Sequence, residues 1–476
     1  MRGFEASIVL VYLFACVAIG LFASRRALGS SAEYWVAGRR IGTVMNSLAI
    51  MAALASGGSF VGILGLAYSK GVPYAFSLFA GAILGFPLAA LLVAKPLRNF
   101  GRFTVTDFLA ARFPHGVVRT LVPVLIVATF TMYTVAQMKT AGLAASFLFG
   151  ISFRSAVTLS ALVFILYVSM GGMLAVTWTD MLQGFLMLSV VWGLGGVLIA
   201  RYGTPAHLME RAVGVAPSLG TVAAAPASSY IGSFVIWSAA ICIIPHIIMR
   251  VYTAKDAHGA RLSLNVAMLL YSLMIIMTLL VLVPVGKTVL PALKDADMLF
   301  FGLVDNVLGP VMRGFAVAAL MASVMSTTDA LLLACSSAIG HDLLGGWIKR
   351  RGSEKLASRV AFASTWAVGL LAMVLAYDPP ELITRYYTEA VGLLTAGLFV
   401  PTVAGLWWKR ANTAGGAAAL VTGAAVFLAG RLLPDTPSFA SILYALPASA
   451  VAMAIGSYLG CPPEKALLDR MAELHR

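Results

Sequence analysis

Long runs of hydrophobic residues, separated by short polar segments, extend over almost the whole chain. A run of about 20 apolar residues is long enough to cross a bilayer as a helix. By that criterion the pattern predicts about 13 transmembrane helices, over residues 6–24, 42–68, 73–95, 119–148, 154–170, 178–200, 229–249, 262–286, 311–340, 358–376, 385–408, 413–432 and 437–459. Helices satisfy their own backbone hydrogen bonds in lipid, so the expected fold is an all-α polytopic membrane protein, with residues 1–476 as a single transmembrane domain.

Two of these hydrophobic runs contain a short polar interruption. One is ASGGSF at residues 55–60, and the other is SVMSTTD at residues 323–329. Backbone that leaves the helix at membrane depth is tolerated only where it is buried in protein or lines a cavity. Paired broken helices are typical of the ion and substrate site of a secondary transporter. The pattern therefore predicts that both helices break and that the two breaks form a binding site.

The order of the predicted helices also suggests an internal repeat. Residues 42–200 and 229–408 each contain five predicted helices. Because five is odd, the second set enters the membrane in the opposite sense to the first, as in transporters built from inverted repeats. We expect a first repeat at 42–200 and a second at 229–408, with an extra N-terminal helix at 6–24 and extra C-terminal helices at 413–459.

The composition supports the membrane assignment. The chain is 60% hydrophobic and only 11% charged, with a mean hydropathy of +0.93, whereas a soluble domain has about 25% charged residues. The stretch 6–24 has no basic region before it and no small-residue cleavage pattern after it, so we expect a retained helix rather than a signal peptide. The four cysteines lie within or just beyond predicted helices and suggest no disulfide framework.

Other classes of membrane protein fit this pattern less well. A channel needs a continuous polar pore, whereas the polar residues here are sparse and clustered. An enzyme needs a catalytic constellation, and the six histidines form no metal-spaced cluster. A receptor needs an attached signalling domain, and the pattern shows no soluble domain. We therefore expect a carrier and not an enzyme.

The net charge of +14 could suggest binding to nucleic acid, but its distribution indicates membrane topology. About two thirds of the lysines and arginines fall in the predicted loops on one side of the membrane, and basic loops stay on the cytoplasmic side. This places the N-terminus outside and the C-terminus in the cytoplasm. We expect the lipid bilayer as a partner, no nucleic acid and no obligate protein partner.

The first interruption offers candidate ligands for a cation. The small residues from Ala52 to Ser59 allow the backbone to unwind, and unwound carbonyl groups can bind a small hard cation, which prefers oxygen ligands. Ser56, Gly57 and Ser59 are candidates for contact with a substrate. The alternative is close helix packing, because small residues are common where membrane helices meet.

The second interruption places polar groups on one helix face. Ser323, Ser326 and Thr327 follow an i, i+3, i+4 spacing and could complete a cation site. They could instead bond back to the preceding turn of their own helix. Asp329 follows within the same hydrophobic run, where an acid is expensive unless it is paired, so it is a candidate for binding an ion or a proton, or for a structural pair.

Two further charged residues need an explanation. Asp180 opens the predicted helix 178–200, where it could cap the helix or face the route of the cation to the cytoplasm. Lys139 lies inside the predicted helix 119–148, where it could snorkel toward the surface or pair with an anion. Glu389 is the natural structural partner for Lys139, and the carboxylate of a substrate is the alternative.

The seventh predicted helix contains Trp237 and the segment PHIIMR at 245–250. Pro245 is expected to break or kink the helix, and Arg250 marks its cytoplasmic end. Trp237 could form one wall of a substrate cavity, or it could be an ordinary core aromatic residue.

Several motifs resemble the sodium:solute symporter family, also called the sodium/glucose cotransporter family. They are YWVAGRR (34–40), the GGMLA, WTD and Q run (171–183), PHIIMR (245–250), the MSTTDALLLACSSAI and HDL run (325–343) and GLWWKRANTAGGAAA (405–419). The resemblance runs from about residue 5 to about residue 430 of the chain. It implies a LeuT-like core of two inverted five-helix repeats, with extra helices at both ends.

The resemblance also implies a site for sodium as the coupling ion, without any other cofactor. The implied ligands are the carbonyl groups of Ala52, Ala55 and Ser323 and the hydroxyls of Ser326 and Thr327. The Asp of the WTD motif, here Asp180, helps a second sodium or its exit path in some members. Asp329 departs from the hydroxyl or apolar residue that is common at its position, so it joins Asp180 as a candidate for a second cation.

The run GRFTVTDFLAARF (101–113) and the AQM at 136–138 are similar to bacterial acetate and monocarboxylate permeases, while PHIIMR and MST are similar to pantothenate permeases. A proline-carrier member has an Asp where this chain has Leu54, which makes a proline substrate less favoured. A sialic-acid member holds a carboxylate with a basic residue on the helix that corresponds to that of Lys139. These resemblances imply that Lys139 binds the carboxylate of a small organic anion near Ser56 and Ser59.

The expected protein is thus a secondary symporter in the cytoplasmic membrane of a bacterium. It couples inward sodium flow to the uptake of a small organic solute, expected to be a carboxylate, by alternating access. Two alternatives stay open, namely a proton-coupled symporter and a sodium-coupled carrier of a neutral solute such as a sugar or an amino acid.

Overall fold

The computed structural model describes residues 2–27, 36–345, 348, 354–379 and 382–476. Every regular element among them is helical, apart from one isolated bridge between Ile41 and Ala254. The first two residues of the YWVAGRR motif and the basic residues 349–351 lie outside the described residues. The fold is all-α, as the hydrophobic pattern predicts.

The first half of the chain forms these helices: α1 (Gly3–Ala27), α3 (Thr43–Leu54), η2 (Gly58–Gly62), α4 (Ile63–Lys70), α5 (Val72–Ala89), α6 (Lys95–Phe100), α7 (Val105–Arg112), α8 (Gly116–Phe149), α9 (Phe153–Tyr202), α10 (Pro205–Val215) and α11 (Ala227–Ala240). The helix α9 covers two of the expected spans, 154–170 and 178–200. It is divided at Gly172, whose φ of 59° and ψ of −174° are a conformation that glycine adopts without strain.

The second half forms α12 (Pro245–Thr253), α13 (Ala257–Met277), α14 (Val283–Val289), η6 (Ala296–Met298), α15 (Leu299–Val307), α16 (Pro310–Ser337), η7 (Ala338–Leu343), α18 (Glu354–Leu375), α19 (Ile383–Trp407), α20 (Thr413–Leu432), α21 (Ile442–Leu459) and α22 (Lys465–Glu473). The helix α16 is the central helix of the molecule, because its most apolar stretch is completely buried, and it contacts α1, α3, α8 and α9.

Ten helices among the described residues are long and apolar enough to cross a membrane, or eleven when a bent pair counts as one span. The expected number was about 13, and the difference lies at residues 154–170 and 358–376. Apolar helices do form there, but Phe153–Ser169 and Arg359–Leu375 are no longer than 17 residues. Such a helix is about 25 Å long, slightly shorter than the roughly 30 Å hydrocarbon core.

The first predicted break is present. The helices Thr43–Leu54 and Gly58–Lys70 form one span that bends by 61° between them. The second predicted break is wrong, because α16 runs without interruption through residues 323–329. The hydroxyls of this segment bond to carbonyl groups, as Ser323 does to Leu320 at 2.7 Å and Thr328 to Val324 at 2.7 Å, so they leave the helix intact. The segment contains no glycine or proline to break it.

The structure has its second break at the proline that the sequence singles out. The helix α11 ends at Ala240, four residues follow outside any helix, and α12 begins at Pro245. Proline lacks the amide that would continue the hydrogen bonds of the helix. Both broken spans therefore contain helix ends at membrane depth.

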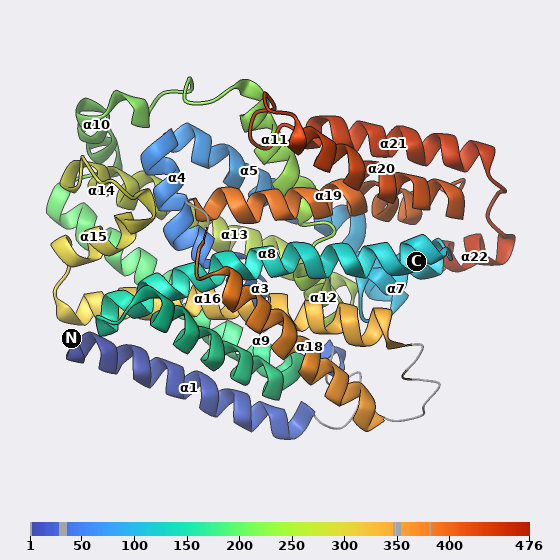
Figure 1. The fold of residues 1–476 in the computed structure, drawn as a ribbon, viewed down its shortest axis with the longest axis horizontal. Helices are drawn as coiled ribbons and strands as arrows, with labels where there is room; N and C mark the ends of the chain where they lie inside the picture. Colours follow the sequence, from blue (N-terminus) through green and yellow to red (C-terminus); the bar gives the residue numbers. More distant parts are fainter. Residues whose placement is uncertain (1, 28–35, 346–347, 349–353, 380–381) are drawn as a thin grey trace.

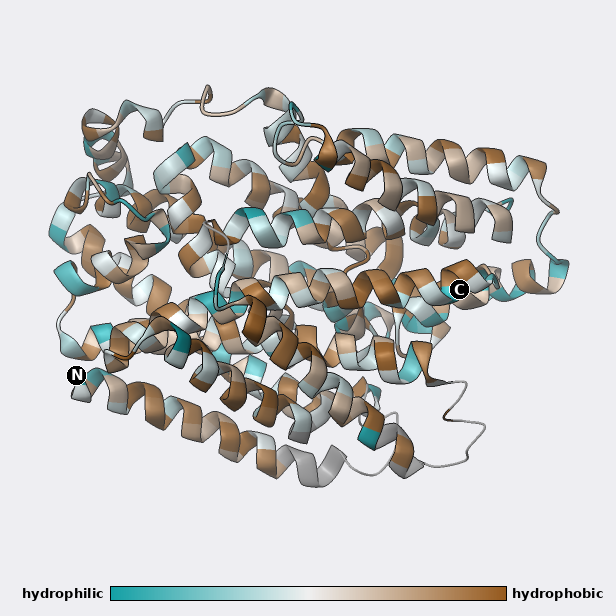
Figure 2. Ribbon diagram, in the orientation of Figure 1, coloured by the Kyte–Doolittle hydropathy of each residue, from teal (hydrophilic) through white to brown (hydrophobic). Residues whose placement is uncertain are grey.

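The helices lie mostly along the long axis of the molecule (Figure 1). The N-terminus and the C-terminal helix α22 lie toward opposite ends of that axis in this view. Apolar residues cover much of the outer helices α1, α20 and α21, and hydrophilic residues gather at helix ends and in loops (Figure 2). This distribution is that of a helical bundle that is surrounded by lipid.

Candidate ion and substrate site

The break after α3 is held open by a side chain from another helix. Ala55 leaves the helical region with φ −72° and ψ 70°. The amide of Gly57 then donates a hydrogen bond to Oε1 of Gln137 on α8, at 3.0 Å. A buried amide that has left its helix needs such an acceptor. Gln137 thus replaces the helical hydrogen bond that the break removes.

The glycines of the break are required by close packing. A Cβ atom on Gly57 would lie 2.9 Å from side-chain atoms of Thr140 and Val324, and one on Gly58 would overlap the ring of Tyr387. Both interpretations of the motif, an unwound backbone and close helix packing, therefore apply. The small residues unwind the backbone, and they also let three helices approach it. A larger residue at either position would push these helices apart.

The hydroxyls of α16 meet the last carbonyl groups of α3. Ser326 Oγ donates to the carbonyl oxygen of Ala52 at 2.9 Å, and Thr327 Oγ1 donates to that of Ala53 at 3.1 Å. Ser326 Oγ also lies 3.2 Å from the carbonyl oxygen of Ser323. All of these groups are buried. The arrangement brings together four of the five expected sodium ligands, with the carbonyl of Ala53 as an addition.

Ala55 is the fifth expected ligand, and its position is less direct. Its amide donates to the carbonyl of Met51 at 2.8 Å, and no hydrogen bond joins its carbonyl to α16 among the described residues. The converging oxygens suit a small hard cation, which prefers oxygen ligands and no nitrogen or sulfur. To bind one, the hydroxyls of Ser326 and Thr327 would turn their protons away and present lone pairs.

Asp180 forms a buried ion pair with Arg250. The two side chains are 0% and 1% exposed, and Arg250 also donates to Thr177 Oγ1. The first of the two roles considered for Asp180 is therefore wrong, because α9 resumes at Gly172, well before it, and Asp180 caps no helix start. Arg250 lies in the last turn of α12, at the expected helix end, and it is one of the most deeply buried large side chains. The side of the membrane that this end faces stays a prediction.

Asp329 is buried beside this pair without a partner of its own. The residue is 0% exposed, and neither carboxylate oxygen has a hydrogen bond among the described residues. Asp180 and Arg250 both act on it electrostatically. Two acids and one arginine leave this cluster one positive charge short of neutrality when both acids are ionised. A buried cluster of this kind favours a bound cation or a proton.

Lys139 has a buried acidic partner that the sequence did not predict. Its Nζ atom lies 2.9 Å from Oδ2 of Asp297, which belongs to η6. Burial raises the pKa of Asp297 above its ordinary value, and the positive charge of Lys139 offsets part of that rise. Glu389, the expected partner, instead pairs with Arg431 at 3.3 Å. A lysine on α8 and an acid on η6, far along the chain, can be brought together only by the tertiary fold.

Aromatic residues surround the break. The rings of Tyr133 and Tyr387 are stacked with centroids 5.0 Å apart, and Trp237 meets Tyr387 edge to face at 5.8 Å. The indole of Trp237 donates to Thr388 at 3.3 Å. Ser59 Oγ lies 3.5 Å from the hydroxyl of Tyr271. Trp237 is therefore part of an aromatic layer of the core, next to the break.

Two functional candidates were missed from the sequence. Gln137 Nε2 is a buried donor without a partner among the described residues, and both ring nitrogens of His246 are in the same condition. His246 follows Pro245 directly at the second break, and its ring lies against Phe130 and Tyr133. Both residues lie in motifs that the sequence analysis singled out. For Gln137 the usable signal was an amide side chain inside an apolar run, two residues before Lys139.

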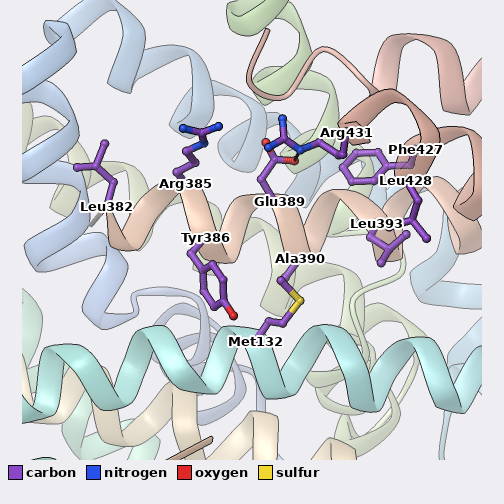
Figure 3. Close-up of a pocket in the computed structure, with 10 residues that line it drawn as sticks. All are labelled: Met132, Leu382, Arg385, Tyr386, Glu389, Ala390, Leu393, Phe427, Leu428 and Arg431. Atoms are coloured by element: carbon purple, nitrogen blue, oxygen red, sulfur yellow. Dashed lines mark ion pairs between the residues drawn. The ribbon is translucent and has the colours of Figure 1, made fainter. Parts of the chain in front are cut away.

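A separate cavity of about 520 Å³ lies on another face of α19. Tyr387 and Thr388 contact the aromatic layer, whereas their neighbours on the helix line this cavity (Figure 3). Its lining residues come from α8, α19 and α20 and from the residue before α19, and they are Met132, Leu382, Arg385, Tyr386, Glu389, Ala390, Leu393, Phe427, Leu428 and Arg431.

Comparison with known proteins identifies relatives over most of the chain. Residues 34–423 match the pattern of the sodium:solute symporter family. The uncharacterized symporter YwcA of Bacillus subtilis (strain 168) is 27% identical over 418 residues, which are 85% of this chain and 81% of that protein. The osmoregulated proline transporter OpuE of the same organism is 28% identical over 432 residues, which are 88% of this chain and 87% of that protein.

Solved structures share the fold. A Na⁺-coupled sialic acid symporter in a substrate-bound outward-open state has a TM-score of 0.79 at 20% identity, covering 97% of this chain and 98% of that chain. Mhp1, a nucleobase-cation-symport-1 family transporter, has a TM-score of 0.58 at 15% identity, covering 94% and 99%. MhsT in complex with L-phenylalanine has a TM-score of 0.52 at 13% identity, covering 88% and 98%. The expected LeuT-like fold is confirmed.

Proposed function

The chain belongs to the sodium:solute symporter family and is therefore a sodium-coupled solute symporter, and we propose that its solute is a small organic carboxylate, taken up by alternating access. The proposed ion site is supported by the contact between α16 and the end of α3. Ser326 and Thr327 point their hydroxyls at the carbonyl groups of Ala52 and Ala53, at 2.9 and 3.1 Å. Sodium between these oxygens would tie α16 to the broken helix.

The solute site lies, in this proposal, beside the break at Ser56, Gly57 and Ser59, with Trp237 in the surrounding wall. Gln137 supports this placement, because its Oε1 atom already holds Gly57 and its Nε2 donor has no partner among the described residues. A carboxylate accepts hydrogen bonds and would satisfy that donor. Binding of the two ligands is then coupled, since both sites depend on the conformation of residues 55–57.

Lys139 is engaged by Asp297 in this conformation. Its ammonium group has three N–H donors, and those that bind Asp297 would become free for the solute carboxylate in an open state, once Asp297 moves away. We retain Lys139 as a proposed solute ligand for such an open state. η6, which carries Asp297, packs on α4, the second half of the broken span, so a movement of that half would act on the ion pair directly.

A second cation would give an anion carrier access to the membrane potential. One sodium and one monovalent anion move no net charge, whereas each net charge gains about 2.3 kcal/mol per 100 mV. The cluster of Asp180, Asp329 and Arg250 is the proposed second site, because it is one positive charge short of neutrality. Its unpaired Asp329 also favours the second candidate function, in which the additional coupling ion is a proton.

The two broken spans also bear on the topology of the chain. We propose that residues 42–200 and 229–408 form two inverted repeats, and the breaks at 55–57 and 241–244 support this because each falls in the first span of its repeat. We further propose an external N-terminus and a cytoplasmic C-terminus in a bacterial cytoplasmic membrane, on the basis of the basic loops.

Uptake by purified protein in proteoliposomes tests the function. A panel of labelled solutes, comprising acetate, lactate, pantothenate, sialic acid, proline and glucose, is offered with a sodium gradient or a proton gradient imposed separately. We expect a sodium gradient to drive the uptake of at least one carboxylate and not of glucose. Uptake of proline or glucose alone would refute the carboxylate proposal, and uptake driven by a proton gradient without sodium would refute sodium coupling.

A further inference from the structure

The cavity between α8, α19 and α20 changes in character along its length. Its three charged lining residues, Arg385, Glu389 and Arg431, come from the beginning of α19 and the end of α20. These two ends are adjacent because the helices are antiparallel neighbours. A cavity with charge at one end and apolar walls at the other suits an amphipathic ligand.

The deeper part of the cavity is apolar. Leu393 lies two turns after Arg385 on α19, Phe427 lies one turn before Arg431 on α20, and Met132 comes from the middle of α8. The cavity thus extends from the outer ends of the helices toward the middle of a bilayer, where the acyl chain of a lipid ends. Figure 3 shows Met132 on α8 reaching toward α19.

The charged end carries a net positive charge. Glu389 is engaged by Arg431 at 3.3 Å and by the amide of Phe439 at 3.4 Å. Arg385 is exposed. It acts electrostatically on Glu389, but among the described residues it forms no close ion pair and no hydrogen bond. One positive charge therefore stays available at the mouth of the cavity, which complements a single phosphate group.

The cavity opens onto the lipid-facing surface rather than onto the solute site. Leu428 is 48% exposed, and Val421 and Leu432 continue the exposed apolar strip along α20. On α19 the residues that contact the aromatic layer, Tyr387 and Thr388, face away from the cavity. A ligand from the membrane can enter here.

We propose that this cavity binds an anionic phospholipid, with its phosphate on Arg385 and an acyl chain between Leu393, Phe427 and Met132. Bound lipid would brace α19 against α20 and would stabilise the position of Tyr387 beside the broken helix. This lipid site is distinct from the ion and solute sites, and its occupation does not depend on which solute is carried.

Native mass spectrometry of the full chain, released from nanodiscs, measures the binding directly. The probes are palmitoyl-oleoyl phosphatidylglycerol, which is anionic, and palmitoyl-oleoyl phosphatidylcholine, which has no net charge. We expect the wild-type protein to retain phosphatidylglycerol with at least fivefold preference, and Arg385→Gln to lose that preference. Arg154→Gln is the matched control, because Arg154 is an exposed arginine at the beginning of the membrane helix α9, and it should keep the preference.

A second variant tests the apolar part without changing any charge. Ala390→Trp would fill the cavity, and we expect it to lower phosphatidylglycerol retention at least fivefold. An equal loss in Arg154→Gln, or unchanged retention in both Arg385→Gln and Ala390→Trp, would overturn the proposal. Displacement of bound lipid by octanoate at equimolar concentration would also overturn it, since the ligand would then be an amphipathic carboxylate from solution. None of these measurements involves transport, so their failure leaves the symport proposal intact.

Discussion

The amide of Gly57 in the broken span donates a hydrogen bond to Oε1 of Gln137 on α8, at 3.0 Å. This contact joins the unwound backbone to α8, which spans Gly116–Phe149. It also places the amide nitrogen Nε2 of Gln137 beside the proposed solute site. The break is therefore stabilised from outside, by a residue that the local sequence of the motif does not contain.

We predict that Gln137→Leu lowers sodium-driven uptake at least tenfold. The substitution leaves the buried amide of Gly57 without an acceptor, which costs about 1–3 kcal/mol, and it removes the proposed donor to the solute. Initial uptake rates in proteoliposomes check this. Thr134→Val on the same helix should transport normally, because the hydroxyl of Thr134 only bonds back to Phe130. Equal rates for Gln137→Leu and the wild type would contradict the assignment.

Ser326→Ala and Thr327→Val should each raise the sodium concentration for half-maximal uptake about tenfold. The loss of one hydrogen-bonding or ligating group to a charge costs about 1.5–3 kcal/mol, and each 1.4 kcal/mol is a tenfold change in affinity. Ser323→Ala is the control, because the proposed ligand there is the carbonyl group. Its hydroxyl bonds to Leu320, so its sodium dependence should stay within about twofold of the wild type. A shift of the same size in all three variants would argue against this ion site.

Asp180→Asn should destabilise the protein by about 3–5 kcal/mol, because it leaves Arg250 buried without its counter-charge. The double variant Asp180→Asn/Arg250→Met should recover part of that loss. The ion pair of Arg313 with the exposed Asp305 provides the comparison, since Asp305→Asn should cost at most about 1 kcal/mol. Denaturation of the purified variants in detergent gives these values, and additive losses in the double variant would show that the two residues act independently.

Asp329→Asn should abolish the dependence of carboxylate uptake on membrane potential. The substitution keeps the shape of the side chain but removes the negative charge that makes the cluster with Asp180 and Arg250 one positive charge short of neutrality. Uptake is measured at potentials set by potassium and valinomycin, with sodium and proton concentrations varied in turn. If the variant stays as voltage-dependent as the wild type, the second cation binds elsewhere.

Asp107 should make the stability of the protein depend on acid pH. Burial acts to raise the pKa of Asp107, but hydrogen bonds from His341 and from the amides of Phe103 and Thr104 outweigh it and hold the pKa below its ordinary value. The ionised form is therefore the stabilising one. Its contribution is complete above the unfolded pKa of about 3.9 and is lost as the pH falls through the lower folded value.

We expect Asp107→Asn to lower the melting temperature at pH 7 and to narrow the difference from the wild type as the pH is taken below 4. The residue also completes the capping box of α7 with Thr104, a contact worth about 1 kcal/mol. Scanning fluorimetry from pH 7 to pH 3 measures both effects. A constant difference across this range would mean that the charge of Asp107 contributes nothing.

The proposed ion site shows which contacts could be predicted from the local sequence. The spacing of Ser323, Ser326 and Thr327 placed them on one helix face, and the resemblance to the symporter family matched them with Ala52. The structure brings these groups together. The same hydroxyls were also expected to break α16, and that inference failed because serine and threonine can satisfy their bonds within or across helices without unwinding them.

The charged residues show what the local sequence could not predict, namely the partner of each buried charge. Lys139 and Asp180 were recognised as charges that need an explanation, and Glu389 was matched with Lys139, but the sequence assigned the correct partner to none of the three. Their observed partners are Asp297, Arg250 and Arg431. A charge in a hydrophobic run indicates that a partner exists, and nothing in the run indicates which helix supplies it.

The sequence alone determined that this protein is a bundle of membrane helices, that it belongs to a symporter family, and that the span predicted at 42–68 breaks at small residues. These features follow from hydrophobic run length, helical periodicity and backbone freedom, which are properties of neighbouring residues. Only the tertiary structure decided which polar groups meet across the bundle, because contacts such as Gly57 with Gln137 and Lys139 with Asp297 depend on how distant helices pack.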